Sequence, residues 1–327
     1  RSKTRLGRFA GDLVVFFWFL SWAVYLAWQR VFPYLFDDEY GVLGAAAVLA
    51  GLDWSTPPGM PFYGFVLSIF VAPFYWLNLD PTSLYRVALS INGVLVASSA
   101  WLALRVVRRV APDTAEATAV LSVIAGFSYP AVLFYAGLAL GETALLFALM
   151  LTVYGLALVT LTRYEALRGG VFLGLGLAIA AYAHSRGLVF SVTAIPIVLV
   201  GLKVGWVSRS AIFAALAAAV PMVAVLSITK AWLIGNFYSS VRVGTSSATD
   251  FFANKLLSVF APDNLSNLLL VTFGQFAYLL SSTFGLLLVG VCGLYVSAVE
   301  REKSSSLKLD EESTRGATLV IAFVALT

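Results

Sequence analysis

Three consecutive acidic residues, Asp37, Asp38 and Glu39, are the strongest chemical signal in the sequence. They follow directly on the first long apolar run, which predicts that they stand at the edge of a membrane. Ionisable groups in or beside membrane segments are costly and tend to be functional. One acid would be enough to cap a following helix, whose N-terminus favours negative charge. Three in a row exceed that need, so we expect the cluster to form a site as well as a cap.

Two further groups stand at the ends of other apolar runs. Glu142 precedes the fourth run, where it either caps a helix or lines a cavity. Arg186 follows the only histidine, His184, and has no acid close to it in sequence. An arginine in this position suits a phosphate ligand, although it could also extend to lipid headgroups without a specific role. His184 by itself is more typical of a hydrogen-bonded helix end than of a catalyst.

Three more cations, Lys230, Arg242 and Lys255, lie at or near a second long connection. Together with Arg186 they would place positive charge opposite the acids. A group-transfer reaction needs a carboxylate base and positively charged side chains that bind the anionic leaving group. Taken singly, Arg242 and Lys255 are better explained as scattered loop charges.

The elements that must position these groups are membrane helices. Of the 327 residues, 60% are hydrophobic and only 12% are charged, and the mean hydropathy is +0.91. Soluble domains carry about 25% charged residues, so a soluble enzyme, a nucleic-acid-binding domain and a disordered chain are excluded. The apolar runs are continuous rather than alternating, which excludes an outer-membrane barrel. One cysteine, Cys292, and one histidine exclude an intrachain disulfide, a His/Cys metal cluster and a bis-histidine haem.

Eight apolar runs are candidate membrane helices. We predict spans at residues 10–32, 84–104, 114–134, 143–162, 170–185, 187–202, 210–234 and 281–299, with the start of a ninth from residue 317. That last run has about eleven residues, too few to cross a bilayer, and the chain does not begin with methionine. We therefore expect a fragment of a longer protein, truncated at its C-terminal end.

The positive-inside rule predicts how the chain crosses the membrane. The run 60–78 is either a span or a helix lying in the interface. If it does not span and the N-terminus is cytoplasmic, 15 Lys and Arg residues lie inside and 6 outside, whereas a span at 60–78 changes the split to 9 and 12. The first arrangement predicts an external loop at 33–83 with interfacial helices near 38–51 and 60–78. It also predicts a second long external segment at 236–280 and a cytoplasmic linker at 300–316.

This arrangement resembles the polytopic glycosyltransferases of the GT-C fold, which include protein O-mannosyltransferases, the aminoarabinose transferase that modifies lipid A, and mycobacterial-type arabinofuranosyltransferases. The likeness rests on short motifs at the ends of the spans: Asp38-Glu39-Tyr40, Leu49-Ala50-Gly51-Leu52-Asp53, Pro57-Pro58-Gly59, Arg86, Arg105–Arg109, Gly141-Glu142 and Ser185-Arg186-Gly187. The motifs are short and indicate a superfamily rather than one member. Relatives carry Asp-Glu or Asp-Asp, so Asp37 and Asp38 both remain candidates for the base. We favour Asp38 as the base. If Asp38-Glu39 is taken as the Asp-Glu pair of the relatives, Gly51 and Asp53 downstream also fall into line with their motif.

The resemblance implies an all-α, multi-pass enzyme of the cell membrane that works on the extracytoplasmic side. It would move a sugar from a polyprenyl-phosphate donor to a glycan, lipid or protein acceptor. An aspartate, Asp38 or Asp37, would take the proton of the acceptor hydroxyl as that oxygen attacks the anomeric carbon, with inversion. The lipid phosphate would leave, held by Arg186, Lys230 and Arg242.

Glu39, Glu142 and His184 would support this site. A divalent metal would fit if Asp37, Asp38 and Glu142 converge, because clustered carboxylates suit hard cations. Some relatives work without a metal, so this point stays open, and no other cofactor is implied. The main alternative is a transporter or flippase for a lipid-linked or anionic substrate. Such a protein would place charges near the bilayer midplane on broken helices, whereas we expect the strongest charges at the external ends of the spans.

Overall fold

The computed structural model describes residues 2–29, 37–54, 64–160, 163–184, 187–237, 315 and 317–321. Within these ranges the chain is helical and contains no strand, which confirms the predicted all-α class. In chain order the helices are α1 (Ser2–Trp28), α2 (Asp37–Leu49), α3 (Val66–Tyr75), α4 (Pro81–Val110), α5 (Glu116–Phe127), α6 (Pro130–Ala136), α7 (Glu142–Leu158), α8 (Arg163–Ala183), α9 (Gly187–Lys203) and α10 (Arg209–Asn236).

Four of these helices are long and apolar enough to cross a membrane, namely Leu6–Trp28 of α1, Pro81–Val110, Tyr164–Ala183 and Arg209–Asn236. Helices α5 and α6 make a fifth if the two segments, which meet at 67°, form one bent span. Helices α7 and α9 are apolar but shorter, with 17 residues each. As far as they are described, the seven predicted runs between residues 10 and 234 all coincide with helices. The run 281–299 lies outside the described residues, so the full number of eight to nine spans stays a prediction.

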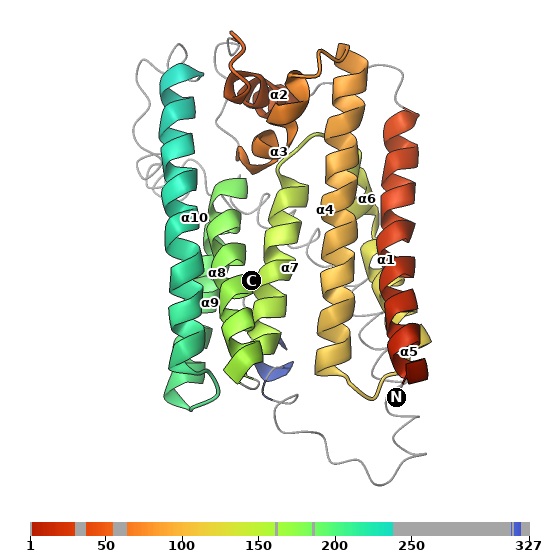
Figure 1. Ribbon diagram of the computed structural model, residues 1–327, viewed down its shortest axis with the longest axis vertical. Helices are drawn as coiled ribbons and strands as arrows, with labels where there is room; N and C mark the ends of the chain where they lie inside the picture. Colours follow the sequence, from red (N-terminus) through yellow and green to blue (C-terminus); the bar gives the residue numbers. More distant parts are fainter. Residues whose placement is uncertain are drawn as a thin grey trace, which may run out of the picture.

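The long helices run roughly parallel to one another, with α1 and α10 at opposite edges of the view in Figure 1. Helix α1 packs along α4, α4 along α7, and α8 lies between α7 and α10. The short helices α2 and α3 lie at the upper end of the view, which we name the α2–α3 end. The opposite end, which we name the N-terminal end, holds the start of α1, the end of α4 and the start of α10.

Helices α2 and α3 form one unit in the connection between α1 and α4. Three side chains of the α3 region donate hydrogen bonds to carbonyl groups in α2 or directly after it: Ser68 to Val42 (2.8 Å), Tyr75 to Leu43 (2.8 Å) and Trp76 to Ala50 (2.9 Å). Burial, with a further contribution from Tyr40, raises the pKa of Tyr75 to about 12, so its hydroxyl keeps the proton it donates. Helix α3 is only about 15 Å long at 1.5 Å per residue, so it does not cross a core of about 30 Å by itself.

Helix α4 carries several residues of the site described below, and its start is well defined. Asp80 is the N-cap residue, and its side chain accepts hydrogen bonds from the N–H groups of Thr82 and Ser83. Pro81 occupies the first turn, where no N–H is needed. Hydrogen bonding, first with the Ser83 side chain and then with backbone N–H groups, lowers the pKa of Asp80. The cap therefore acts as a carboxylate at neutral pH.

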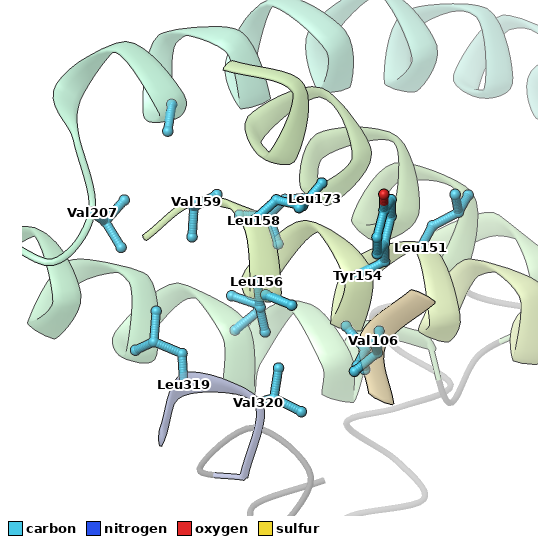
Figure 2. Packing of buried hydrophobic residues seen from close by; sticks show 14 of the residues in the cluster. Val106, Leu151, Tyr154, Leu156, Leu158, Val159, Leu173, Val207, Leu319 and Val320 are labelled. Carbon is cyan, nitrogen blue, oxygen red and sulfur yellow. The ribbon is translucent and has the colours of Figure 1, made fainter. Parts of the chain in front are cut away.

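Apolar side chains from distant parts of the chain form the core toward the N-terminal end. Figure 2 shows Val106 of α4 and Leu156 of α7 in one cluster with Val207, which follows α9. Leu319 and Val320 join the same cluster although they lie more than a hundred positions further along the chain. The segment 317–321 thus packs toward the N-terminal end of the bundle. The predicted linker 300–316 precedes this segment in the sequence.

Candidate active site

The start of α2, the start of α7 and the end of α8 meet at the α2–α3 end. Two glycines, Gly64 before α3 and Gly141 before α7, allow the backbone to approach Ala183 at the end of α8 closely. A Cβ on Gly141 would lie 2.7 Å from the carbonyl oxygen of Ala183, and a Cβ on Gly64 would collide with the same oxygen. Larger residues would force these segments apart, because backbone atoms cannot move aside as a flexible side chain can.

Glu39 lies in the first turn of α2 and is completely buried. Its Oε1 atom accepts two hydrogen bonds of 2.6 Å, one from the hydroxyl of Tyr85 on α4 and one from the backbone N–H of Ala139. A carboxylate can be buried at acceptable cost only when donors of this kind surround it. Glu39 therefore joins α2 both to α4 and to the connection between α6 and α7.

A second polar pair holds the same connection. Asn92 lies seven residues after Tyr85, on the same face of α4. Its Nδ2 donates to the carbonyl of Leu138, and its Oδ1 accepts a 2.6 Å hydrogen bond from the hydroxyl of Thr143. Asn92 and Thr143 are both buried. The backbone before α7 is therefore held at two successive residues, which fixes where α7 begins.

Glu142, the first residue of α7, faces the end of α8. Its Oε1 lies 3.8 Å from the Nε2 of His184, and the two side chains are 23% and 12% exposed. The separation is too long for a hydrogen bond, so the contact is electrostatic and depends on a protonated histidine. The partial exposure leaves both groups accessible to a ligand.

Lys230 lies within the last two turns of α10 and is partly buried. It shares a helix face with three buried residues that pack against α2 and Phe65: Leu226, Leu233 and Phe237. In the same part of α10, the Ser227 hydroxyl lies 2.5 Å from the hydroxyl of Tyr182, two residues before His184. Lys230 is thus on the side of α10 that faces α2, as expected for a charged residue within a membrane helix.

The remaining predicted site residues are only partly described. The backbone of Asp37 and Asp38 forms the start of α2, immediately before Glu39, while their side chains lie outside the described part. Arg186 and Arg242 are outside the described residues altogether. Within the described part, no three His, Cys, Asp or Glu side chains form a group that could hold a metal ion. The structure thus brings Glu39, Glu142 and His184 to one end of the bundle with the start of α2.

Sequence reasoning did not identify Tyr85, Asn92 or Thr143. Each is a polar group in or beside a run that reads as apolar, and each is buried in the structure. Such residues are conspicuous because hydrocarbon offers them no hydrogen-bonding partner. Their positions within the predicted spans were the available signal, but the partners could not be recognised before the helices were placed.

A second group of charged residues lies at the other end of the bundle, so the expectation that the strongest charges stand at the external ends of the spans stays a prediction. The densest ion-pair network joins α1, α4 and α5 at the N-terminal end. Arg105 and Arg108 each place a nitrogen 2.6 Å from the carboxylate of Asp12, and Arg108 also pairs with Glu116. Asp12 lies within an apolar helix and is buried, so it requires cations from a neighbouring helix. Arg105 and Arg108 on the neighbouring helix α4 supply them.

Two open apolar grooves lie elsewhere on the bundle. One, of about 480 Å³, runs between α1 and α6, and the other, of about 550 Å³, between α8 and α10. Neither is lined by an acidic residue. The acidic side chains that could take part in a reaction therefore lie outside these grooves, around the start of α2 and the start of α7.

No protein-family model matches the chain, and no curated protein or solved structure matches it. In the part of the chain that the structure describes, the protein is all-helical, has four helices long and apolar enough to cross a membrane, and gathers buried polar groups at the α2–α3 end.

Proposed function

We propose that the protein is a membrane glycosyltransferase of the GT-C kind, which transfers a sugar from a polyprenyl-phosphate donor to an acceptor hydroxyl on the extracytoplasmic side. The observation that carries the proposal is the hydrogen bond from the N–H of Ala139 to Glu39. It joins the acidic start of α2 to the start of α7, where Glu142 and His184 meet. Acids from two distant segments are thereby gathered at one end of a membrane bundle.

The distribution of basic residues supports the proposed side of the membrane. Most Lys and Arg residues of the described part belong to helix ends at the N-terminal end: Lys3, Arg5, Arg8, Arg105, Arg108, Arg109, Arg163, Lys203 and Arg209. The α2–α3 end has Arg86 and, within α10, Lys230. The positive-inside rule then makes the N-terminal end cytoplasmic. The site consequently lies on the extracytoplasmic face, with α2 and α3 along the membrane surface.

In the proposed reaction the acceptor oxygen attacks the anomeric carbon while the bond from that carbon to the lipid phosphate breaks. Asp38, or Asp37, takes the hydroxyl proton. Polyprenyl phosphate leaves as an anion, and Lys230 with Arg186 and Arg242 stabilises its charge. Glu142 and His184 lie where they can bind sugar hydroxyl groups. No step requires a metal ion.

The experiment uses the purified full chain in proteoliposomes with a set of polyprenyl-phosphate sugars carrying mannose, arabinofuranose or aminoarabinose. Release of free polyprenyl phosphate is measured with and without a lipid, glycan or peptide acceptor. We expect turnover with at least one donor, and loss of turnover in Asp38→Asn or Asp37→Asn. Full turnover in both variants would exclude the proposed mechanism, and no turnover with any donor would exclude the proposed function.

A transporter or flippase is the second candidate, supported by the 67° break between α5 and α6. Broken helices form substrate sites in many transporters. The two residues at this break, Ser128 and Tyr129, carry no charge, unlike the start of α2. In the same proteoliposomes, movement of a fluorescent polyprenyl phosphate between leaflets without release of sugar would favour this candidate.

A further inference from the structure

We infer that Glu39 is a positioning residue, which sets the start of α2 against the start of α7 through a single carboxylate oxygen. The inference rests on the proposed function for its role in turnover, but its geometry stands independently. Both hydrogen bonds of 2.6 Å, from Tyr85 and from Ala139, go to Oε1 of Glu39. One atom therefore holds three segments of the chain together.

The position of this oxygen in the chain gives it influence over the site. Glu39 directly follows Asp38, and Ala139 lies three residues before Glu142. A shift of Ala139 relative to α2 would therefore change how the acid that takes the proton faces Glu142 and His184. Displacements of about 1 Å between reacting groups can reduce turnover about a hundredfold.

The two hydrogen bonds that Glu39 accepts form a bridge between α2, α4 and the connection before α7. The surroundings of this connection leave it few other positions. Leu138 and Ala139 are buried, and Asn92 holds the carbonyl of Leu138 from α4. Gly141 is pressed against the carbonyl of Ala183 on its other side. The buried N–H of Ala139 cannot turn to solvent when its hydrogen bond to Glu39 is lost, and a buried N–H without an acceptor is costly, so we expect α2 or α7 to shift.

The geometry also separates positioning from proton transfer. A glutamine at position 39 can present its amide oxygen to both Tyr85 and Ala139, but an amide cannot take a proton at neutral pH. Glu39→Gln should therefore keep turnover within about threefold of wild type, with a modest loss because hydrogen bonds to an ionised acceptor are stronger. Glu39→Ala should reduce kcat about 10- to 100-fold while leaving the KM for the donor nearly unchanged. Tyr85→Phe should show a smaller loss, because the bond from Ala139 remains.

A distance measurement tests the bridge without any substrate. Spin labels are attached to Leu52→Cys, just after α2, and Phe134→Cys, just before the held connection, in a Cys292→Ser background. Both native side chains are exposed, at 46% and 59%. Double electron–electron resonance should give one narrow distance in wild type and in Glu39→Gln. It should give a broader distribution in Glu39→Ala.

Ser68→Ala is the matched control, because the buried hydrogen bond of Ser68 goes to Val42 of α2 and not to the connection before α7. It should lower the melting temperature without broadening the distance or lowering kcat. A narrow distance in folded Glu39→Ala would overturn the inference. Loss of turnover in Glu39→Gln as complete as in Asp38→Asn would also overturn it, by making Glu39 the proton acceptor. If wild type has no turnover with any donor, the proposed function fails, and the distance measurement still decides whether Glu39 holds the two helices.

Discussion

The Nε2 of His184 lies 3.8 Å from the Oε1 of Glu142, which brings the end of α8 to the start of α7. The two groups are too far apart for a hydrogen bond and are partly exposed. The contact is attractive only when His184 is protonated and lacks a hydrogen bond, so we expect it to contribute little to the free energy of unfolding. Their closeness is therefore of more consequence for ligand binding than for stability.

We predict that Glu142→Gln lowers the free energy of unfolding only slightly, because the contact with His184 is not hydrogen-bonded, yet reduces turnover at least tenfold. The amide preserves the shape but removes the charge beside the proposed sugar. Chemical denaturation in micelles and a turnover assay measure the two effects separately. Equal turnover in the variant and wild type would remove Glu142 from the site.

The base can be identified by comparing Asp38→Asn with Asp37→Asn. Loss of a general base costs about 10²–10⁴-fold in rate, whereas loss of a helix-capping acid affects mainly stability. We expect Asp38→Asn to be inactive but folded and Asp37→Asn to retain turnover. The reverse pattern, read from the same release assay, would assign the base to Asp37.

The cations proposed to hold the phosphate should affect the donor more than the fold. Arg186→Ala and Lys230→Ala should each raise the KM for the donor about ten- to hundredfold, since charge-assisted hydrogen bonds are worth about 1.5–3 kcal/mol. Arg186→Lys should recover part of the loss, because it keeps the charge without the planar fork. Arg168→Ala is the control, because that arginine lies over the ring of Phe172 on α8. Unchanged kinetics in both alanine variants would place the phosphate elsewhere.

The ion-pair network at the N-terminal end should contribute more to the free energy of unfolding than the more exposed pair of Arg109 and Glu165. Asp12→Ala leaves Arg108 buried, at 10% exposure, without one of its carboxylate partners. Removing one member of a buried ion pair costs about 3–5 kcal/mol. Arg109→Ala is the comparison, because Arg109 lies 3.9 Å from Glu165 and is 41% exposed, which predicts about 0–1 kcal/mol. Similar losses in the two variants, measured by chemical denaturation, would contradict the distinction.

Close backbone packing between α7 and α8 gives a further prediction. A Cβ on Gly155 would lie 2.5 Å from the backbone nitrogen of Leu173 and 2.8 Å from the carbonyl oxygen of Gly169. Gly155→Ala should therefore lower the free energy of unfolding by about 1–3 kcal/mol. Gly126→Ala is the control, because a Cβ there meets no atom within 4 Å, and alanine favours a helix by up to about 1 kcal/mol over glycine. A stabilised Gly155→Ala would show that the two helices can separate at no cost.

The amino-acid sequence alone determined the class of the protein and much of its helical framework. A long apolar run in a membrane satisfies its backbone N–H and C=O groups within one helix and needs no distant partner. The described residues of the runs between 10 and 234 accordingly coincide with helices. The acids at residues 37–39 were recognised because charge is rare in this chain, and rarity is visible without a structure.

Only the tertiary structure decided which of these groups meet. The bond between Ala139 and Glu39 joins residues 100 positions apart, and hydrophobic periodicity carries no information about such a pairing. The same holds for Asp12 with Arg105 and Arg108, which read as separate charges until α1 and α4 lie side by side. In a membrane a buried polar group must find its partner on whichever helix packs beside it. That choice depends on the packing of small residues such as Gly141 and Gly155 against neighbouring backbone, a property of the assembled bundle.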